Sequence, residues 1–191
     1  MASIFALDEV VLDFVKGLKV LDVGCGGGKW GHLIKVHSIF LSVKEPKIVG
    51  TDISSAYFCK VKHIYDSIIK SHATYLPFRR NSFDTVLACE VIEHMPRREG
   101  FKLIAECERV AKEVAIFTTP PPRTVGHSSE HISSWKPSDF RKLGYKVYGV
   151  RCYPRLASKN ILIQLLIAFV IGPLSCWIPN LSSDMVAVKF L

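Results

Sequence analysis

The sequence predicts an α/β fold, in which strands alternate with helices around a mostly parallel sheet. Two observations support this prediction. A short apolar run over residues 18–23 ends at Gly24 in a glycine-rich turn, and residues 30–36 then show helical spacing of apolar side chains. A second apolar run begins at Lys47 and ends at the acidic residue Asp52. Strand, glycine turn, helix and second strand follow in the order typical of nucleotide-binding β-α-β units.

The glycine-rich turn over residues 24–28 is the first candidate for a ligand site. Glycine adopts positive φ at little cost and allows a ligand close to the backbone. The free N–H groups at the start of the following helix favour a nucleotide-like ligand. The same pattern also fits a tight strand–helix turn that binds nothing, because glycine serves both purposes.

Asp52 stands at the tip of the second predicted strand. In nucleotide-binding β-α-β units, an acidic side chain at this place accepts hydrogen bonds from ribose hydroxyls. Asp52 is therefore the predicted ribose ligand. The alternative is structural, since Asp52 and Ser54 are both residue types that commonly cap a helix.

The remaining elements follow from periodicity and from the residues that end them. Helical spacing predicts helices at the N-terminus, where Ser3 is a candidate cap, and over residues 55–70, 101–110 and 138–143. Apolar runs predict strands over residues 83–90, 113–119, 145–150 and 184–190, and residues 71–78 are expected to be extended.

Composition limits the class of protein and its location. The 191 residues suit one domain with a proper hydrophobic core. The formal net charge of +8 favours anionic partners, although no run of like charges forms a basic arm. The six cysteines contain no C-x-x-C pair, and residues 1–15 lack the basic start of a signal peptide. We therefore expect reduced thiols, neither disulfides nor a zinc site, and a cytoplasmic location.

Five short motifs occur in order along the chain. They are L-D-V-G-C-G-G-G at residues 21–28, the acidic Asp52, L-P-F at 76–78, F-D-T-V at 83–86 and E-V-I-E-H at 90–94. Over roughly residues 15–150, the chain resembles class I S-adenosylmethionine-dependent methyltransferases of the type 11 group. The resemblance implies a Rossmann-like three-layer αβα sandwich with seven mostly parallel strands, the last being antiparallel. It also implies S-adenosyl-L-methionine as cofactor and S-adenosyl-L-homocysteine as product.

The same resemblance assigns cofactor contacts to the first two motifs. Gly24 and Gly26 would lie against the methionine and ribose part of the cofactor, with Cys25 between them. Asp22 would orient the turn and reach toward the amino group. Asp52 would hold the ribose diol.

Further contacts are implied by the later motifs. Ile53 would pack on adenine, and Glu90 would line the pocket at its methyl-donor end. Members usually carry an aspartate before L-P-F that accepts a hydrogen bond from the adenine amino group, but this chain has His72 there. A neutral imidazole accepts through one nitrogen only, so the tautomer must suit. Ala73 and Thr74 would add backbone contacts.

The polar segment over residues 123–137 holds the weak candidates for catalysis. His127 or His131 could act as a general base near neutral pH, with Glu130 beside them. A solvated loop without a catalytic role is the alternative. Although His127 and His131 are four residues apart, we see no third metal ligand in place, so no metal site is expected.

Residues 161–171 form an apolar segment that ends at Gly172. As a helix it would span about 16 Å, far short of the roughly 30 Å hydrocarbon core of a membrane. It could be a lid over the substrate pocket, an interface of a homodimer, or a membrane-surface segment that receives a lipid-like substrate. We expect a single domain, made of an N-terminal helix (1–17), a cofactor-binding core (18–152), this apolar insertion (153–182) and a last strand (183–191).

The methyl acceptor is the least determined part of the prediction. The chain lacks the Asp/Asn-Pro-Pro-Tyr site of base-amino methyltransferases after the strand that ends at Cys89. A small-molecule or lipid-like acceptor is therefore expected. Two alternatives stay open: an RNA or protein methyltransferase that uses the basic surface, and a non-catalytic protein that only binds S-adenosyl-L-methionine.

Overall fold

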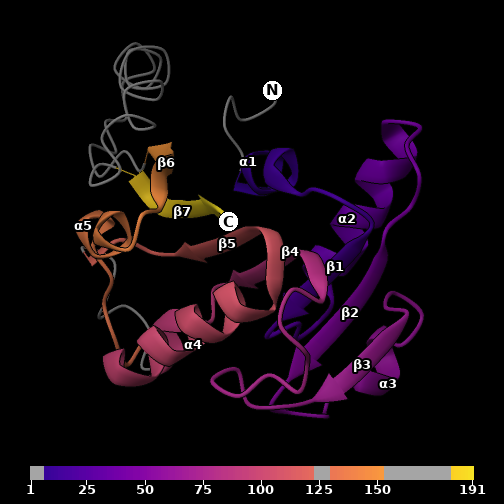
Figure 1. Cartoon of the computed structure of the whole chain (residues 1–191), viewed down its shortest axis with the longest axis horizontal. Helices are drawn as coiled ribbons and strands as arrows, with labels where there is room; N and C mark the ends of the chain where they lie inside the picture. The colour runs from indigo at the N-terminus through magenta and orange to yellow at the C-terminus, as the bar shows by residue number, and fades with distance from the viewer. Residues whose placement is uncertain (1–6, 123–129, 153–181) are drawn as a thin grey trace, which may run out of the picture.

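A computed structural model describes residues 7–122, 130–152 and 182–191 of the chain. A single seven-stranded sheet has the strand order β3-β2-β1-β4-β5-β7-β6 (Figure 1). The strands are β1 (Lys19–Val23), β2 (Lys47–Asp52), β3 (Ser67–Lys70), β4 (Phe83–Cys89), β5 (Ala111–Thr119), β6 (Lys146–Cys152) and β7 (Ser182–Phe190). The helices are α1 (Leu7–Phe14), α2 (Lys29–Phe40), α3 (Phe58–Val61), α4 (Arg97–Val110), α5 (Pro137–Lys142) and the 3-10 helix η1 (Ile92–His94).

Strand directions confirm the predicted sheet. Strands β1 to β5 are all parallel to one another, and β7 is antiparallel to both β5 and β6. Strand β6 therefore runs in the same direction as β5, and β7 alone is reversed. The order turns back between β1 and β4, which is the switch point where open α/β sheets bind ligands beyond the carboxyl ends of their strands.

Two apolar clusters, one on each face of the sheet, form the core. Alternate residues of a strand point to opposite faces, so Val86 belongs to one cluster and Leu87 to the other. Helices α1 and α2 cover the face of Leu87 with side chains such as Val11 and Ile34. Helices α4 and α5 cover the other face. The result is the three-layer αβα sandwich that the sequence predicts.

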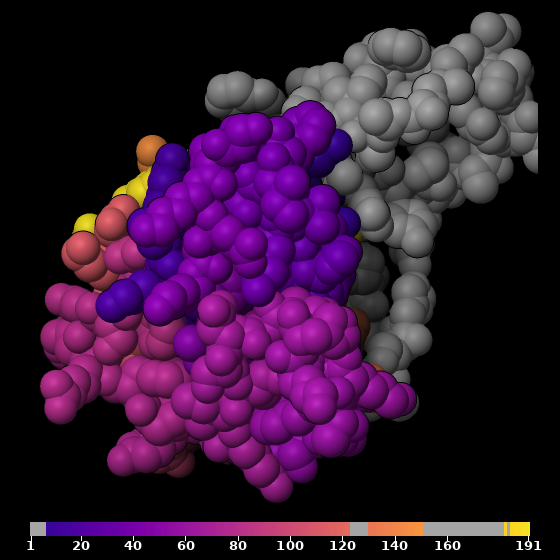
Figure 2. All heavy atoms as spheres, turned by 90° about the vertical axis from the view of Figure 1, so that its right-hand side faces the viewer, coloured from indigo at the N-terminus to yellow at the C-terminus, as the bar shows by residue number. Residues whose placement is uncertain are grey.

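The region after β2 differs from the prediction. Helix over residues 55–70 was expected, but only α3 is helical, and residues 67–70 form the edge strand β3 beside β2 (Figure 1). Figure 2 views the molecule from this edge of the sheet, where the purple and magenta surface belongs to the first half of the chain. Helical spacing of Val61, Ile64 and Ile68 was misleading, because β3 is half-exposed and shows no clear alternation. Backbone pairing with β2, from Val49 to Asp52, supplies the partners that a local pattern cannot reveal.

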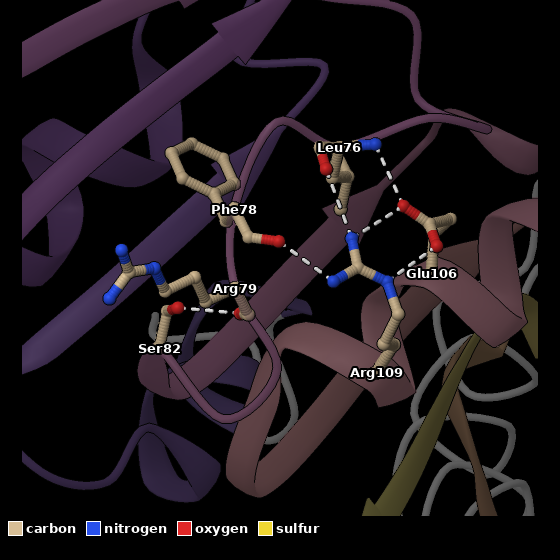
Figure 3. Close-up of polar contacts among 6 residues, drawn as sticks. All are labelled: Leu76, Phe78, Arg79, Ser82, Glu106 and Arg109. Atoms are coloured by element: carbon tan, nitrogen blue, oxygen red, sulfur yellow. Dashed lines mark hydrogen bonds and ion pairs between the residues drawn. The ribbon is translucent and has the colours of Figure 1, made fainter.

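Residues 71–78 do not form a strand, and side chains of α4 hold them instead. The Glu106 carboxylate accepts a hydrogen bond from the backbone N–H of Leu76 at 2.8 Å. Arg109 donates to the carbonyl oxygens of Leu76 and Phe78 at 3.0 and 2.7 Å and is itself paired with Glu106 (Figure 3). This Glu106–Arg109 clamp fixes the segment that leads from β3 to β4.

The other expected elements are present within a few residues of their predicted bounds. Ser3, His127 and the apolar segment 161–171 lie outside the described residues, so their predicted roles stay predictions. Within residues 7–122, 130–152 and 182–191, no helix combines the length and the apolarity needed to cross a membrane.

Candidate functional site

A cavity of about 500 Å³ opens beyond the carboxyl ends of β1, β2, β3 and β4. Six of the ten predicted cofactor residues line it, namely Gly24, Asp52, Ile53, His72, Ala73 and Glu90. Asp22, Cys25, Gly26 and Thr74 are outside its lining. The cavity is therefore in the predicted place, at the switch point of the sheet.

The glycine turn forms one wall and is tied to the tip of β2. The N–H groups of Gly24 and Cys25 both donate to the carbonyl oxygen of Thr51, at 2.7 and 2.9 Å. Gly24 has a φ of 74°, and a Cβ added there would lie 2.4 Å from Val91 Cγ2. Glycine is therefore required at position 24 both by backbone conformation and by the close approach of Val91.

Asp52 holds the turn from the opposite side. One carboxylate oxygen accepts from the N–H of Gly26 at 2.9 Å, and the other accepts from the N–H of Ser54 at 2.8 Å. The alternative role as a helix cap is not realised, because α3 begins only after Tyr57. A carboxylate accepts more than two hydrogen bonds, so Asp52 keeps acceptor capacity toward the cavity.

Asp22 lies beneath the turn and is almost fully buried. Its Oδ2 accepts a hydrogen bond from the Tyr65 hydroxyl at 2.6 Å, whereas Oδ1 has no partner among the described residues. Burial raises the pKa of this carboxyl from 3.8 to about 6. Cys25 is also buried, and burial raises the pKa of its thiol to about 12. The thiol is therefore neutral, and only the backbone of Cys25 is available to a ligand.

His72 is exposed at the cavity wall with one ring nitrogen engaged. Its Nδ1 lies 2.7 Å from Thr74 Oγ1 and accepts from the Thr74 N–H at 3.3 Å. These contacts favour the tautomer that carries its hydrogen on Nε2. His72 then offers the cavity a donor, whereas the aspartate usual at this position offers an acceptor.

Glu90 follows β4 and has a φ of 55°, which is uncommon for a residue with a side chain. Its carboxylate accepts a hydrogen bond from Thr118 Oγ1 at 2.7 Å. Although Glu90 is exposed to the open cavity, the protein atoms around its carboxyl raise its pKa. Strained backbone of this kind commonly occurs at functional sites.

Glu93, His94 and His131 come together at the rim of the cavity. One potential ligand atom from each lies within 4.8 Å of the other two. Glu93 is 1% exposed, and burial raises its pKa, an effect that the neighbouring Glu90 strengthens. His94 lines the cavity, and its ring lies edge-on to that of His131 with centroids 5.1 Å apart.

Our sequence-based interpretation grouped His131 with His127 and Glu130 and gave Glu93 and His94 no role in the site. The structure places His131 beside Glu93 and His94, while the side chain of Glu130 is exposed. The signal that was missed is the adjacent pair Glu93 and His94 shortly after β4, together with His131 in the segment after β5. Which of these residues acts in catalysis stays a prediction.

A family model described as "Methyltransferase domain" matches residues 21–118. Among curated proteins, the sterol 24-C-methyltransferase ERG6B of Gibberella zeae is 35% identical over 108 residues, which are 53% of this chain and 27% of that protein. The ubiquinone biosynthesis O-methyltransferase of Rickettsia bellii is 24% identical over 155 residues, which are 78% of this chain and 64% of that protein. The chain thus spans less than two thirds of either relative.

Solved structures show the same fold. A SAM-dependent methyltransferase from Archaeoglobus fulgidus aligns with a TM-score of 0.66 and 19% identity, over 96% of this chain and 94% of that one. Magnesium protoporphyrin IX methyltransferase from Synechocystis, solved with bound SAM, aligns with a TM-score of 0.59 and 17% identity, over 96% of this chain and 77% of that one. Both likenesses confirm the predicted Rossmann-like architecture.

Proposed function

Since the chain belongs to the methyltransferase domain family, as its five motifs predict, we propose that it transfers a methyl group from S-adenosyl-L-methionine to a small-molecule or lipid-like acceptor. The observation that carries the proposal is that Asp52 and the glycine turn are hydrogen-bonded to each other and lie at the same cavity. A carboxylate with spare acceptor capacity faces a backbone held open by glycine at the carboxyl ends of β1 and β2.

The chemistry of the residues in and beside the cavity supports this cofactor. Backbone at Gly24 and Gly26 would lie along the methionine and ribose part, and Asp52 would accept from the ribose hydroxyls. Ile53 lines the cavity with 62% of its surface exposed, which is unusual for so apolar a side chain. A planar adenine base stacked on Ile53 would cover this surface. His72 would donate to a ring nitrogen of the base through Nε2.

S-adenosyl-L-methionine supplies an activated methyl group on a positively charged sulfur. The contribution of the protein is to align the acceptor atom with that group and to exclude water. Glu90 lines the cavity and would orient the acceptor at the methyl-donor end. No covalent protein nucleophile is required for this reaction, so the site needs only positioning and proton removal.

A small-molecule acceptor agrees with two further observations. The curated relatives are a sterol methyltransferase and a methyltransferase of ubiquinone biosynthesis. Apolar side chains, among them Val91, Met95 and Ile132, line the same cavity as Glu90. An RNA or protein acceptor rests on the net charge of +8 alone, and the apolar lining favours the smaller acceptor.

Calorimetric titration with S-adenosyl-L-homocysteine tests whether the protein binds the cofactor at all. Binding in the micromolar range is expected, and no binding at millimolar ligand would contradict it. A screen of phenols, quinols and sterols with labelled S-adenosyl-L-methionine then tests the acceptor class. If only RNA or protein is labelled, and labelling falls steeply with salt, the basic-surface alternative replaces the small-molecule acceptor.

A further inference from the structure

We propose that Glu93, His94 and His131 form a binding site for a divalent transition metal ion, with Zn²⁺ as the preferred ion. The three side chains present one carboxylate and two imidazoles whose ligand atoms lie within 4.8 Å of one another. Among the described residues, no other group of three or more histidine, cysteine or acidic side chains is close enough to share one ion.

The buried carboxylate of Glu93 is the first observation behind this proposal. Glu93 is 1% exposed, and both of its oxygens lack a hydrogen-bond partner among the described residues. Buried polar groups are almost always satisfied, because leaving one unpaired costs its full desolvation free energy. A metal ion beside the carboxylate would satisfy it and would also offset repulsion from the neighbouring Glu90.

The two histidines supply the second observation. The Nδ1 of His131 is buried and has no partner among the described residues. The Nδ1 of His94 lies 3.1 Å from the carbonyl oxygen of Glu130, which favours a hydrogen on that nitrogen and a free lone pair on Nε2. Metal-bound histidines are typically oriented in this way, with one nitrogen on the ion and the other on a carbonyl or carboxylate.

The surrounding backbone fixes the two ligand-bearing segments to each other. The carbonyl oxygen of Glu93 accepts from the N–H groups of Ile132 and Ser133, at 2.8 and 3.0 Å. Ser133 Oγ donates to the carbonyl of Ile92 at 3.2 Å and accepts from the indole of the fully buried Trp135 at 3.0 Å. His131 is therefore held next to Glu93 by bonds on the residues that follow it.

The donor set indicates the class of ion. Two imidazoles and one carboxylate are characteristic ligands of Zn²⁺ and related transition metals, whereas Mg²⁺ and Ca²⁺ prefer oxygen alone. Three protein ligands leave one position open, as in catalytic zinc sites. Because His94 and Ile132 line the same cavity as Asp52 and Glu90, this open position faces the space where the acceptor would bind.

The position of the ion suggests a hydroxyl-bearing acceptor, and this part of the inference rests on the proposed function. The acceptor oxygen would take the open position, where the ion lowers the pKa of its hydroxyl. The hydroxyl proton leaves to water, the oxygen forms a bond to the methyl carbon, and the carbon–sulfur bond breaks with its electron pair going to sulfur. The products are a methyl ether and S-adenosyl-L-homocysteine.

Metal titration of chelator-treated full-length protein tests the site directly. The background should be Cys59→Ser, because the exposed thiol of Cys59 could bind Zn²⁺ by itself. Calorimetry with Zn²⁺ should give one ion per chain, and Co²⁺ should give the visible absorption of a nitrogen- and oxygen-bound ion. His131→Ala and Glu93→Gln should each weaken Zn²⁺ binding by at least about tenfold. His63→Ala, which removes an exposed histidine elsewhere, should leave it unchanged.

Binding of S-adenosyl-L-homocysteine to the same variants shows that they are folded and separates the two proposals. Retained cofactor binding without Zn²⁺ binding by the parent protein would overturn the metal site and leave the methyltransferase proposal intact. Zn²⁺ binding without cofactor binding would do the reverse. Equal Zn²⁺ affinity in the parent, His131→Ala and Glu93→Gln proteins would also overturn the assignment.

Discussion

The carboxylate of Asp52 accepts a hydrogen bond from the backbone N–H of Gly26 at 2.9 Å. This bond connects the tip of β2 to the glycine turn after β1, so two motifs distant in sequence form one wall of the cavity. Asp52 therefore has one observed task, which is to hold the turn, and one that we propose, which is to accept hydrogen bonds from a ribose.

Replacing Asp52 by alanine should remove both tasks. We expect the affinity for S-adenosyl-L-homocysteine to fall by about tenfold to a hundredfold, since hydrogen bonds to a charged group contribute roughly 1.5–3 kcal/mol. Asp52→Asn keeps one acceptor oxygen and should lose less. The exposed Asp13 serves as control, and calorimetry that finds Asp52→Ala equal to Asp13→Ala would reject the assigned site.

Gly24→Ala should destabilise the fold by about 1–3 kcal/mol, because position 24 has positive φ and its added methyl meets Val91. Adding Val91→Ala should recover the part of the loss that is due to the clash, but not the part due to backbone conformation. Gly27→Ala is the matched control, since a Cβ there meets nothing within 4 Å. Urea unfolding of the four proteins measures the difference.

Asp22 predicts a defined dependence of stability on pH. Its pKa is raised from 3.8 to about 6 by burial, so between these values the unfolded chain ionises while the folded carboxyl keeps its proton. The free energy of unfolding should therefore fall as pH rises through this range, by up to about 3 kcal/mol, and the loss is complete above pH 6. At lower pH than 3.8 both states are protonated and this contribution vanishes.

Asp22→Asn should abolish that fall while keeping an acceptor for Tyr65. The check is chemical unfolding of both proteins at several pH values between 4 and 7, with the difference between them plotted against pH. If the free energies of unfolding of the parent protein and Asp22→Asn change in parallel with pH, the Asp22 carboxyl does not titrate as described.

Even the conservative substitution Arg109→Lys should destabilise the protein. Its guanidinium bonds two carbonyl oxygens and Glu106 at once, a geometry that an ammonium group cannot reproduce. We expect Arg109→Lys to lower the free energy of unfolding by about 1–3 kcal/mol and to weaken cofactor binding, because the clamped segment leads to His72. Arg79→Lys, on an exposed side chain, should change neither quantity in unfolding and calorimetric measurements.

His72→Asp should strengthen the binding of S-adenosyl-L-homocysteine. The histidine offers a donor to the cavity because Thr74 occupies its Nδ1, whereas aspartate would offer the acceptor that the adenine amino group needs. A gain of about 1 kcal/mol, or roughly fivefold in affinity, is expected. His63→Asp repeats the charge change outside the cavity, and a similar gain in both variants would trace the effect to charge alone.

Elements with a strong local sequence pattern were predicted correctly, and elements that depend on distant partners were missed. Strand β1 was predicted because residues 18–23 are apolar apart from Lys19 and Asp22, and the structure indeed buries residues 20–23. Strand β3 was missed because an edge strand is half-exposed, and its isoleucines continue a helical spacing that starts at Val61. Pairing with β2 decides that segment, and pairing is a non-local interaction.

The candidate site divides in the same way. The sequence by itself determined that the glycine turn and Asp52 come together at the ends of β1 and β2, because Gly24, Gly26 and Asp52 act through backbone conformation and strand ends, which are local properties. Only the tertiary structure decided the neighbours of Glu93 and His131. Those two residues meet because backbone bonds from Ile132 and Ser133 to the Glu93 carbonyl join segments far apart in the chain, and no local pattern encodes such a contact.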